Sequence, residues 1–384
     1  MKTSRIVVLA GAVLALAACS DQSPVASRSA GPAPLLSAGA NAIDGSYIVV
    51  VEEGADPRAV AAIAGVNPNH VYTAAVNGFS AELNAGQLNA LQHVAGVEYV
   101  EEDQVFTATT TQSNATWGID RIDQRSLPRS TTYNYTATAS GVYAYVIDTG
   151  IYTSHSQFGG RATNVYDALG GSGQDCNGHG THVAGTIGSA TYGVAKAVRL
   201  RGVRVLGCSG SGSTSGIIAA VDWLRNNRTN PAVANMSLGG GYSSTLNTAV
   251  NNLANSGVFI AVAAGNENQN ACNVSPASAG SATTVASSTS SDAKSSFSNY
   301  GSCVDLYAPG SSITSTWLNG GTNTISGTSM ASPHVAGVAA LYKATYGNAS
   351  SSTIDSWIKS NATANVITGN PSGTPNRLLY KSTL

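Results

Sequence analysis

Three polar residues, far apart in the chain, have the side-chain types that nucleophilic catalysis requires. Asp148 ends an apolar run, His179 stands in a glycine-rich segment at the start of a predicted helix, and Ser329 opens another predicted helix. A serine hydroxyl is a weak nucleophile that needs an adjacent base. Histidine would take its proton and later donate it to the leaving amine, while aspartate would hold the imidazole tautomer and stabilise the imidazolium. The three residues together could catalyse acyl transfer, such as peptide-bond hydrolysis.

Each of the three residues alone is also typical of an ordinary structural role. A strand-end aspartate is usually a cap or a salt-bridge partner, and a serine at a helix start is usually an N-cap. His179 and His182 form a His-x-x-His pair, but no glutamate follows the first histidine as it does in zinc metalloprotease helices. His155 and His334 are expected to be structural. The catalytic hypothesis therefore depends on the combination.

Alternating strands and helices are predicted to position these side chains. Continuous apolar runs, expected to be strands, cover residues 141–147, 200–206, 233–238 and 258–264. Predicted helices between them cover residues 179–190, 215–226 and 244–256. This order predicts a doubly wound α/β fold, with a parallel sheet covered by helices on both faces. Because ligands bind at the carboxyl ends of such strands, Asp148 and Asn266 are well placed for a site.

A smaller α+β domain is predicted ahead of this segment. Strands are expected at residues 46–51, 77–83 and 97–105, and helices at 57–64 and 85–94. Asp56 before Pro57 is a plausible helix cap. Asn77-Gly78 is read as a turn signal before the second strand. The order is βαββαβ-like, as in ferredoxin-like domains. A Thr-rich stretch at 107–114 suits a cleavable linker.

The N-terminal residues resemble an export signal. Lys2 and Arg5 precede an apolar run at 6–18 that is short for a membrane span. Leu16-Ala17-Ala18-Cys19 also resembles a lipoprotein box, in which the cysteine would carry lipid. The predicted organisation is a signal peptide at 1–18, a linker at 19–42, a small domain at 43–108, a cleavable linker at 109–112 and a catalytic domain at 113–384.

The net charge of the 384-residue chain is −1, which indicates no nucleic-acid or anionic-membrane partner. Residues 43–106 contain nine acidic residues and one basic residue, hence −8, whereas residues 113–384 contain fifteen basic and ten acidic residues, hence +5. The two segments could attract each other, although two unrelated surfaces would show the same charges.

Three motifs carry a resemblance to a known family. They are Val-Ile-Asp-Thr-Gly at 146–150, Asn-Gly-His-Gly-Thr-His-Val-Ala-Gly at 177–185 and Gly-Thr-Ser-Met-Ala-Ser-Pro-His-Val-Ala-Gly at 327–337. In the order Asp, His, Ser they resemble the signatures of the subtilases. Residues 235–240 and 263–266 match as well. The resemblance covers 113–384 and is nearest to the proteinase K and aqualysin branch, which implies a serine endopeptidase that is a monomer.

The resemblance also implies a substrate site. The Asn266 side chain and the Ser329 N–H would bind the oxyanion. The small neighbours Gly178, Gly180 and Gly327 would let the substrate backbone approach. An extended peptide would add a strand to two edges and place one side chain in a pocket with small walls, which implies broad cleavage after aromatic or aliphatic residues. The edges and walls would be Ser237, Leu238, Gly239, Gly210, Ser211, Gly212, Ala263, Ala264 and Gly265.

Four cysteines follow Cys19, and an even number in an exported chain favours disulfides. The sequence alone permits three pairings. The resemblance pairs Cys176 with Cys208 and Cys272 with Cys303, each loop being worth roughly 3–4 kcal/mol of stability. It also implies structural calcium and no catalytic cofactor. The calcium ligands would be Asp305 with the carbonyls of Gly280 and Ala282, and at a second site Asp120, Asp123 and Gln124, where Ser130 and Thr132 replace the expected acid and amide.

The acidic segment at 43–108 resembles the inhibitor prodomains of subtilases. This implies a self-processing precursor whose prodomain assists folding and blocks the active site until cleavage between residues 106 and 113. Two alternatives stay open. One is an inactive relative that only binds peptides, and the other is an esterase or peptide ligase with the same triad.

Overall fold

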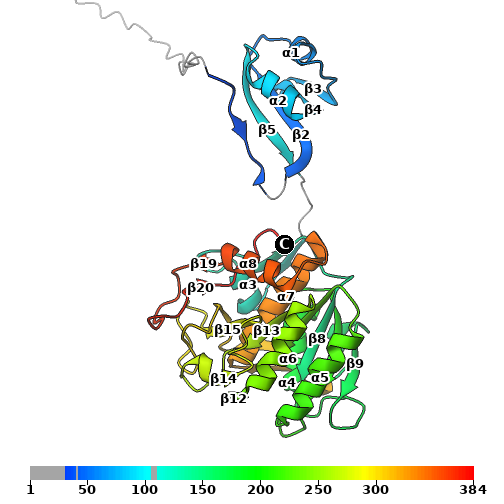
Figure 1. Ribbon diagram of the computed structural model, residues 1–384, viewed down its shortest axis with the longest axis vertical. Coiled ribbons are helices and arrows are strands. Elements are labelled where there is room, and N and C mark those ends of the chain that lie inside the picture. The colour runs from blue at the N-terminus through cyan, green and yellow to red at the C-terminus, as the bar shows by residue number, and fades with distance from the viewer. Residues whose placement is uncertain (1–30, 40–41, 105–109) are drawn as a thin grey trace, which may run out of the picture. The chain divides into compact units, whose positions relative to one another are not determined.

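A nine-stranded sheet lies at the centre of the larger of two units, residues 108–384 (Figure 1). All neighbouring strands are parallel except the first two, which are antiparallel. Across the sheet the strands are β19 (Thr363–Ala364), β20 (Arg377–Leu378), β16 (Leu306–Pro309), β15 (Thr283–Ser288), β13 (Phe259–Ala263), β11 (Ala232–Met236), β8 (Tyr143–Asp148), β10 (Arg199–Arg204) and β9 (Ala162–Asp167). The predicted doubly wound α/β class is confirmed.

The computed structural model describes residues 31–39, 42–104 and 110–384. The predicted signal peptide at 1–18 and Cys19 lie outside the described residues. Within the described ranges, no helix combines the length and the apolar character that a membrane crossing requires.

Helices cover both faces of the large sheet. Helices α4 (His179–Gly188), α7 (Thr328–Tyr346) and α8 (Ser351–Asn361) contribute to one core cluster, and α5 (Thr214–Asn227) and α6 (Ser244–Asn255) to a second. Along β8, Ala144 and Val146 belong to the first cluster, and Tyr145 and Ile147 to the second. Since successive strand side chains point to opposite faces, a strand buried on both faces is apolar at every position.

Shorter elements complete the large unit. Strands pair antiparallel as β6 (Thr110–Ser113) with β7 (Thr132–Tyr135), β12 (Gly240–Gly241) with β14 (Val274–Ser275), and β17 (Ile313–Thr316) with β18 (Thr322–Ile325). Helical turns are α3 (Trp117–Ile122), η2 (Ser156–Phe158), η3 (Ala271–Asn273) and η4 (Leu318–Gly320).

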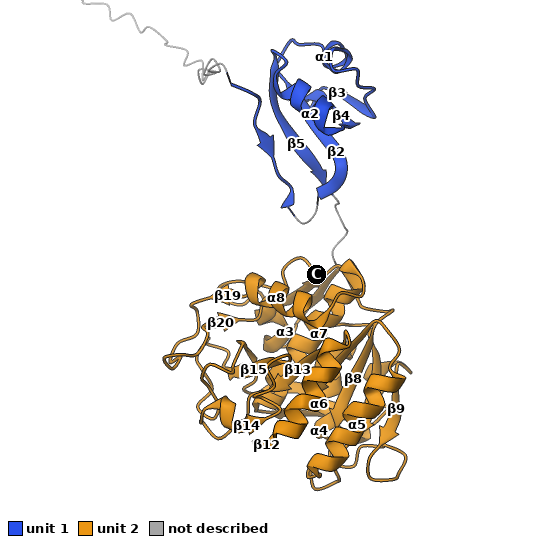
Figure 2. Cartoon of the chain, in the orientation of Figure 1, with its two compact units in different colours: residues 1–107 blue, residues 108–384 orange. Residues whose placement is uncertain are grey.

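The smaller unit is a five-stranded sheet with two helices (Figure 2). Its strand order is β1 (Leu35–Leu36), β5 (Val97–Gln104), β2 (Ala42–Val51), β4 (Asn77–Glu82) and β3 (His70–Thr73), and its helices are α1 (Pro57–Ile63) and α2 (Ala85–Gln92). Val49, Phe79 and Leu91 are fully buried in its core. Asp56 caps α1 by accepting a hydrogen bond from the Arg58 N–H, as its position before Pro57 predicts.

The structure corrects the reading of Asn77-Gly78 as a turn. Both residues lie inside β4, and Gly78 pairs with Val50 on one side and Tyr72 on the other. A Cβ at Gly78 would lie 2.2 Å from the carbonyl oxygen of Val49, so glycine here permits a close approach of β2.

Two predicted linkers contain structured residues. Strand β1 lies inside the expected linker 19–42, and Ala33 before it is buried in the small core. Strand β6 begins at Thr110, inside the expected cleavable linker 109–112, and pairs with β7. Strands this short have no periodicity that a sequence reading can detect, because pairing with a distant partner defines them.

Candidate active site

Asp148 and His179 are joined by a short hydrogen bond. Asp148 is the last residue of β8 and is fully buried, and His179 is the first residue of α4. The Asp148 Oδ1 atom lies 2.7 Å from His179 Nδ1 and also accepts the Thr149 N–H at 2.7 Å. A carboxylate can only accept, so Nδ1 donates and Nε2 is the nitrogen that remains available as a base.

The pKa of His179 is raised above its ordinary value of 6.5. Burial by itself lowers the pKa, because it disfavours the charged imidazolium. The charge of Asp148, its hydrogen bond and the charge of Asp175 raise the pKa, and together these three effects outweigh burial. The site thus favours a proton on the imidazole.

Asp175 fixes the segment before His179, a role that the sequence analysis did not predict. It lies four residues before His179, and its Oδ1 accepts the N–H groups of Asn177 and Gly178 and the hydroxyl of Thr149. Its Oδ2 accepts the N–H and hydroxyl of Thr181. An acid just ahead of a helix start is a usable signal, since carboxylates satisfy the free N–H groups there.

Ser329 is the second residue of α7 and is held against the end of β11. Its hydroxyl donates to the Ser237 carbonyl at 3.2 Å, and the Ser237 hydroxyl donates to the Ser329 carbonyl at 2.8 Å. Among the described hydrogen bonds none joins Ser329 to His179. Catalytic hydrogen bonds are often long or misaligned before substrate binds.

Asn266 follows β13, and its amide is oriented by Thr328. Its Oδ1 accepts the N–H of Thr328 at 2.8 Å and the Thr328 hydroxyl at 3.0 Å. The Nδ2 group is therefore left as a donor beside the start of α7. The Ser329 N–H lies in the first turn of α7, where backbone N–H groups have no partner within the helix.

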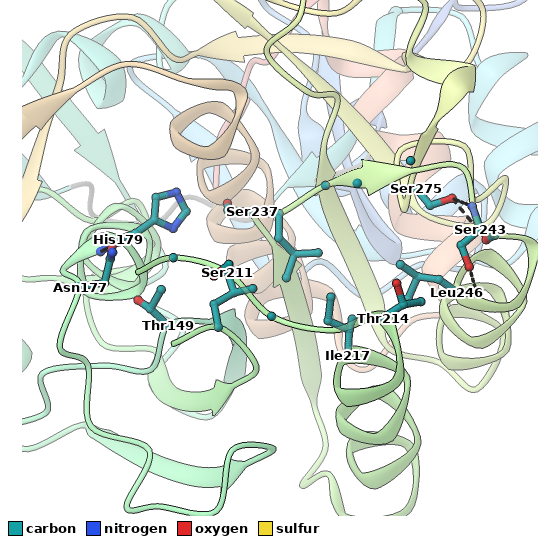
Figure 3. A pocket seen from close by; sticks show the side chains of 17 residues that line it. Thr149, Asn177, His179, Ser211, Thr214, Ile217, Ser237, Ser243, Leu246 and Ser275 are labelled. Atoms are coloured by element: carbon teal, nitrogen blue, oxygen red, sulfur yellow. Dashed lines mark hydrogen bonds between the residues drawn. The ribbon is translucent and has the colours of Figure 1, made fainter. Parts of the chain in front are cut away.

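Two adjoining hollows run past these residues. The first, of about 400 Å³, is lined by His179, Gly210, Ser211 and Gly212 on one side and Ser237, Leu238 and Gly239 on the other. Figure 3 shows His179 at one end and Ser243, Leu246 and Ser275 at the other. The second hollow, of about 340 Å³, is lined by Leu238, Gly239, Ala263, Gly265, Asn266, Val274 and Ser329 among others. Leu238 and Gly239 line both hollows.

One predicted wall residue points elsewhere. Ala263 and Gly265 line the second hollow, whereas Ala264 is fully buried in a cluster with Tyr307 and Val304. Successive side chains of an extended segment alternate in direction, so three consecutive residues cannot all face the pocket.

The glycines around His179 serve internal packing rather than substrate approach. A Cβ at Gly178 would lie 2.4 Å from the ring of Trp317, and one at Gly180 would lie 2.2 Å from the Gly150 carbonyl oxygen. Gly178 also has φ of +106°, which glycine adopts without strain. At Gly327 a Cβ would lie 3.7 Å from the Asn266 Oδ1 atom, so only this glycine borders the predicted oxyanion site.

Two disulfides brace the loops of the site. Cys176 is bonded to Cys208, and Cys272 to Cys303, which is the pairing that the resemblance implies. The first links the segment before His179 to the Gly210 loop. The second links the segment after Asn266 to the segment before β16.

The carboxyl oxygens predicted as calcium ligands are engaged by groups of the chain itself. Asp120 accepts hydrogen bonds from Ser130 and Thr131, Asp123 from Asn134, and the Gln124 oxygen from Ser130. Burial raises the pKa of Asp123. Asp305 accepts the Thr284 N–H and forms an ion pair with Lys359. Gly280 and Ala282 line a separate hollow of about 240 Å³.

His182 and His334 are buried, as expected of structural histidines. Burial lowers the pKa of each to about 4, so both are neutral at physiological pH. His155 is buried as well, and its Nε2 bonds with the Gly321 carbonyl.

Comparison with known proteins identifies the class of protein that has this sheet, this Asp-His pair and this serine at a helix start. Residues 139–378 match the model of the subtilase family, and residues 58–109 match that of peptidase inhibitor I9. The chain belongs to the subtilase family. It is a subtilisin-like serine proteinase that carries an I9 prodomain.

The chain is similar to known proteases over most or almost all of its length. The extracellular serine proteinase of Thermus sp. (strain Rt41A) is 50% identical, with 99% of both chains covered. The cuticle-degrading protease of Metarhizium anisopliae is 47% identical, again with 99% of both covered. A crystal structure of a cold-adapted subtilisin-like serine proteinase is 56% identical, covering 71% of this chain and 99% of the other, with a TM-score of 0.69.

Proposed function

We propose that this proteinase is a secreted endopeptidase that cleaves peptide bonds through an acyl-enzyme on Ser329. The observation that carries the proposal is the hydrogen bond between the buried Asp148 and the partly exposed His179, at the edge of the groove that continues to Ser329 and Asn266. A peptide-binding relative without activity would have no use for a carboxylate buried behind a histidine, because burying an ionised carboxylate is costly.

His179 acts as the general base and then as the general acid. Nε2 accepts the Ser329 proton as Oγ attacks the scissile carbonyl, and the imidazolium formed is stabilised by Asp148. The imidazolium then protonates the leaving amine, and water hydrolyses the acyl-enzyme through the same groups. The hydroxyl must first turn from the Ser237 carbonyl toward Nε2, which substrate binding would promote.

The tetrahedral oxyanion is bound by two donors. The Asn266 Nδ2 group is oriented by the two hydrogen bonds from Thr328 to Oδ1, and the Ser329 N–H lies in the first turn of α7. The positive end of the helix dipole adds to these donors. Donors fixed before the reaction need no reorganisation when the charge develops.

The substrate lies between the two edges that line the first hollow. Ser237, Leu238 and Gly239 form one edge, and Gly210, Ser211 and Gly212 form the other. The side chain before the scissile bond enters the second hollow, between Leu238, Ala263 and Val274. Small and apolar walls of this kind accept aromatic and aliphatic side chains with little discrimination.

The I9 prodomain is proposed as the inhibitor and folding partner of the enzyme, with self-cleavage as the activating step. The excess of acidic residues in the prodomain and of basic residues in the catalytic segment is consistent with docking. Because Thr110 and the residues after it pair with β7, we expect cleavage on the N-terminal side of that strand, at 106–109. Residues 1–18 would direct export of the precursor. A lipid on Cys19 would stay attached to the prodomain when cleavage releases the enzyme.

Structural calcium, which the resemblance implies, would have to compete for carboxylates that other groups of the chain already engage. The acids at both expected sites are already hydrogen-bonded or paired. Every step of the mechanism uses groups of the chain alone.

The test compares the purified precursor with its Ser329→Ala variant, using azocasein hydrolysis and mass spectrometry. We expect the parent to digest casein and to lose its N-terminal segment at 106–109, and the variant to stay full length and inactive. If both folded proteins remained intact and inactive, the peptide-binding alternative would replace the proposal. Hydrolysis of an ester but not of casein would favour the esterase alternative.

A further inference from the structure

Lys359 bridges two carboxylates that belong to different parts of the fold. Its Nζ atom lies 2.7 Å from Asp305 Oδ1 and 2.7 Å from Asp355 Oδ2. Lys359 and Asp355 are one turn apart on α8, whereas Asp305 directly precedes β16. The three side chains are each between 22% and 29% exposed, so the bridge is largely shielded from solvent.

The second oxygen of each carboxylate is also engaged. Asp305 Oδ2 accepts the Thr284 N–H at 2.8 Å, and Asp355 Oδ1 accepts the Thr283 hydroxyl at 2.8 Å. Thr283 and Thr284 begin β15. The cluster therefore connects α8 to the starts of β15 and β16, and the ammonium is the only positive charge that the described ion pairs place on either acid.

The two carboxylates, each 2.7 Å from the Lys359 Nζ atom, favour the charged form of the lysine. Burial raises the pKa of Asp305, while Lys359 lowers it in part. Burial lowers the pKa of Lys359, but the two carboxylates outweigh it, and the pKa of the lysine is raised. A divalent ion at Asp305 would have to displace this ammonium or lie beside it.

We propose that the Lys359 ammonium serves as the built-in cation at Asp305, in place of a calcium ion. The resemblance implied calcium at Asp305, and the geometry puts a side-chain cation on that carboxylate. The lysine then fixes α8 to the edge of the sheet at all calcium concentrations. This inference concerns stability and is independent of the proposed catalytic steps.

The test measures thermal unfolding by scanning calorimetry in excess chelator and in excess calcium. All proteins carry Ser329→Ala, so that self-digestion does not interfere. In chelator we expect Lys359→Met to lower Tm by roughly 3–6 °C, because two carboxylates lose their shared cation. Calcium should restore at least half of that loss in Lys359→Met, and this recovery should vanish when Asp305→Asn is added. Lys359→Arg keeps the charge and is the matched control.

The Ser329→Ala protein that keeps Lys359 is the parent of these variants. In this parent, any rise in Tm caused by calcium should be the same with and without Asp305→Asn. The proposal is overturned if Asp305→Asn abolishes a rise seen in the parent, because calcium would then already use this site. It is also overturned if Lys359→Met leaves Tm in chelator unchanged, or if calcium restores nothing in that variant.

Discussion

The side-chain oxygen of Asn266 accepts two hydrogen bonds from Thr328, one from its N–H and one from its hydroxyl. Thr328 immediately precedes Ser329, so the residue that orients the amide is covalently attached to the proposed nucleophile. The two proposed oxyanion donors thus share one support, the first turn of α7.

Asn266→Ala should lower kcat by about 100- to 1000-fold with little change in KM, because the lost donor acts only when the oxyanion forms; the magnitude is the one known for subtilisin, a relative of this chain. Initial rates on a chromogenic peptide would measure it. Asn227→Ala, at an exposed asparagine of α5, is the control and should leave kcat unchanged. If Asn266→Ala lowered kcat by less than fivefold, Asn266 would not be an oxyanion donor.

The buried Asn299 side chain holds the segment that carries Asn266. Its Oδ1 accepts the N–H groups of Glu267 and Gln269, and its Nδ2 donates to the Ala264 carbonyl and the Glu267 carboxylate. Asn299→Ala should therefore misplace the oxyanion donor and lower kcat by roughly tenfold or more.

A double-mutant cycle separates this role from general destabilisation. In the Asn266→Ala background the added Asn299→Ala change should cost less than threefold in kcat, because the donor that it positions is already absent. Full additivity of the two losses would show that Asn299 does not act through Asn266.

The pH dependence of kcat/KM should report His179. The base must be neutral, so activity falls as the pH drops through its pKa, and the raised pKa places this acidic limb above pH 6.5. Asp148→Asn removes the charge that raises the pKa. We expect the limb to move to lower pH and kcat to fall about 10⁴-fold, as in other serine proteases with this trio. Asp222→Asn, on the exposed side of α5, should change neither quantity; an unmoved limb in Asp148→Asn would contradict the assigned pair.

Maturation should depend on the small core of the prodomain. Phe79 is fully buried there, and Phe79→Ala should remove about 3–5 kcal/mol of stability. A domain this small has little in reserve, so the prodomain should unfold and the yield of mature enzyme should fall sharply. Calorimetry of the Ser329→Ala precursor and the yield of active protease would measure both effects. Ile63→Ala, at a residue 69% exposed in the same unit, is the matched control; an equal yield from the two variants would argue against a folding role.

The sequence by itself determined the class of fold and the residues proposed for chemistry. The apolar runs ending at Asp148 and near Ala264 correspond to β8 and β13, because strands covered on both faces are apolar at every position. The helices that begin near His179 and Ser329 were equally visible. These features are local in sequence. Each of the three motifs is a short run of neighbouring residues, so the chemistry that it indicates can be recognised without the fold.

Only the tertiary structure decided which groups support these residues. Asn299 reaches Ala264 over 35 positions, and Lys359 reaches Asp305 from another element. Ala264 lies in a buried cluster and not in the pocket that its neighbours line, and β1 and β6 are strands because they pair with distant segments. Such contacts depend on packing between separate elements, and no spacing or periodicity along the chain records which polar groups the fold will bring together.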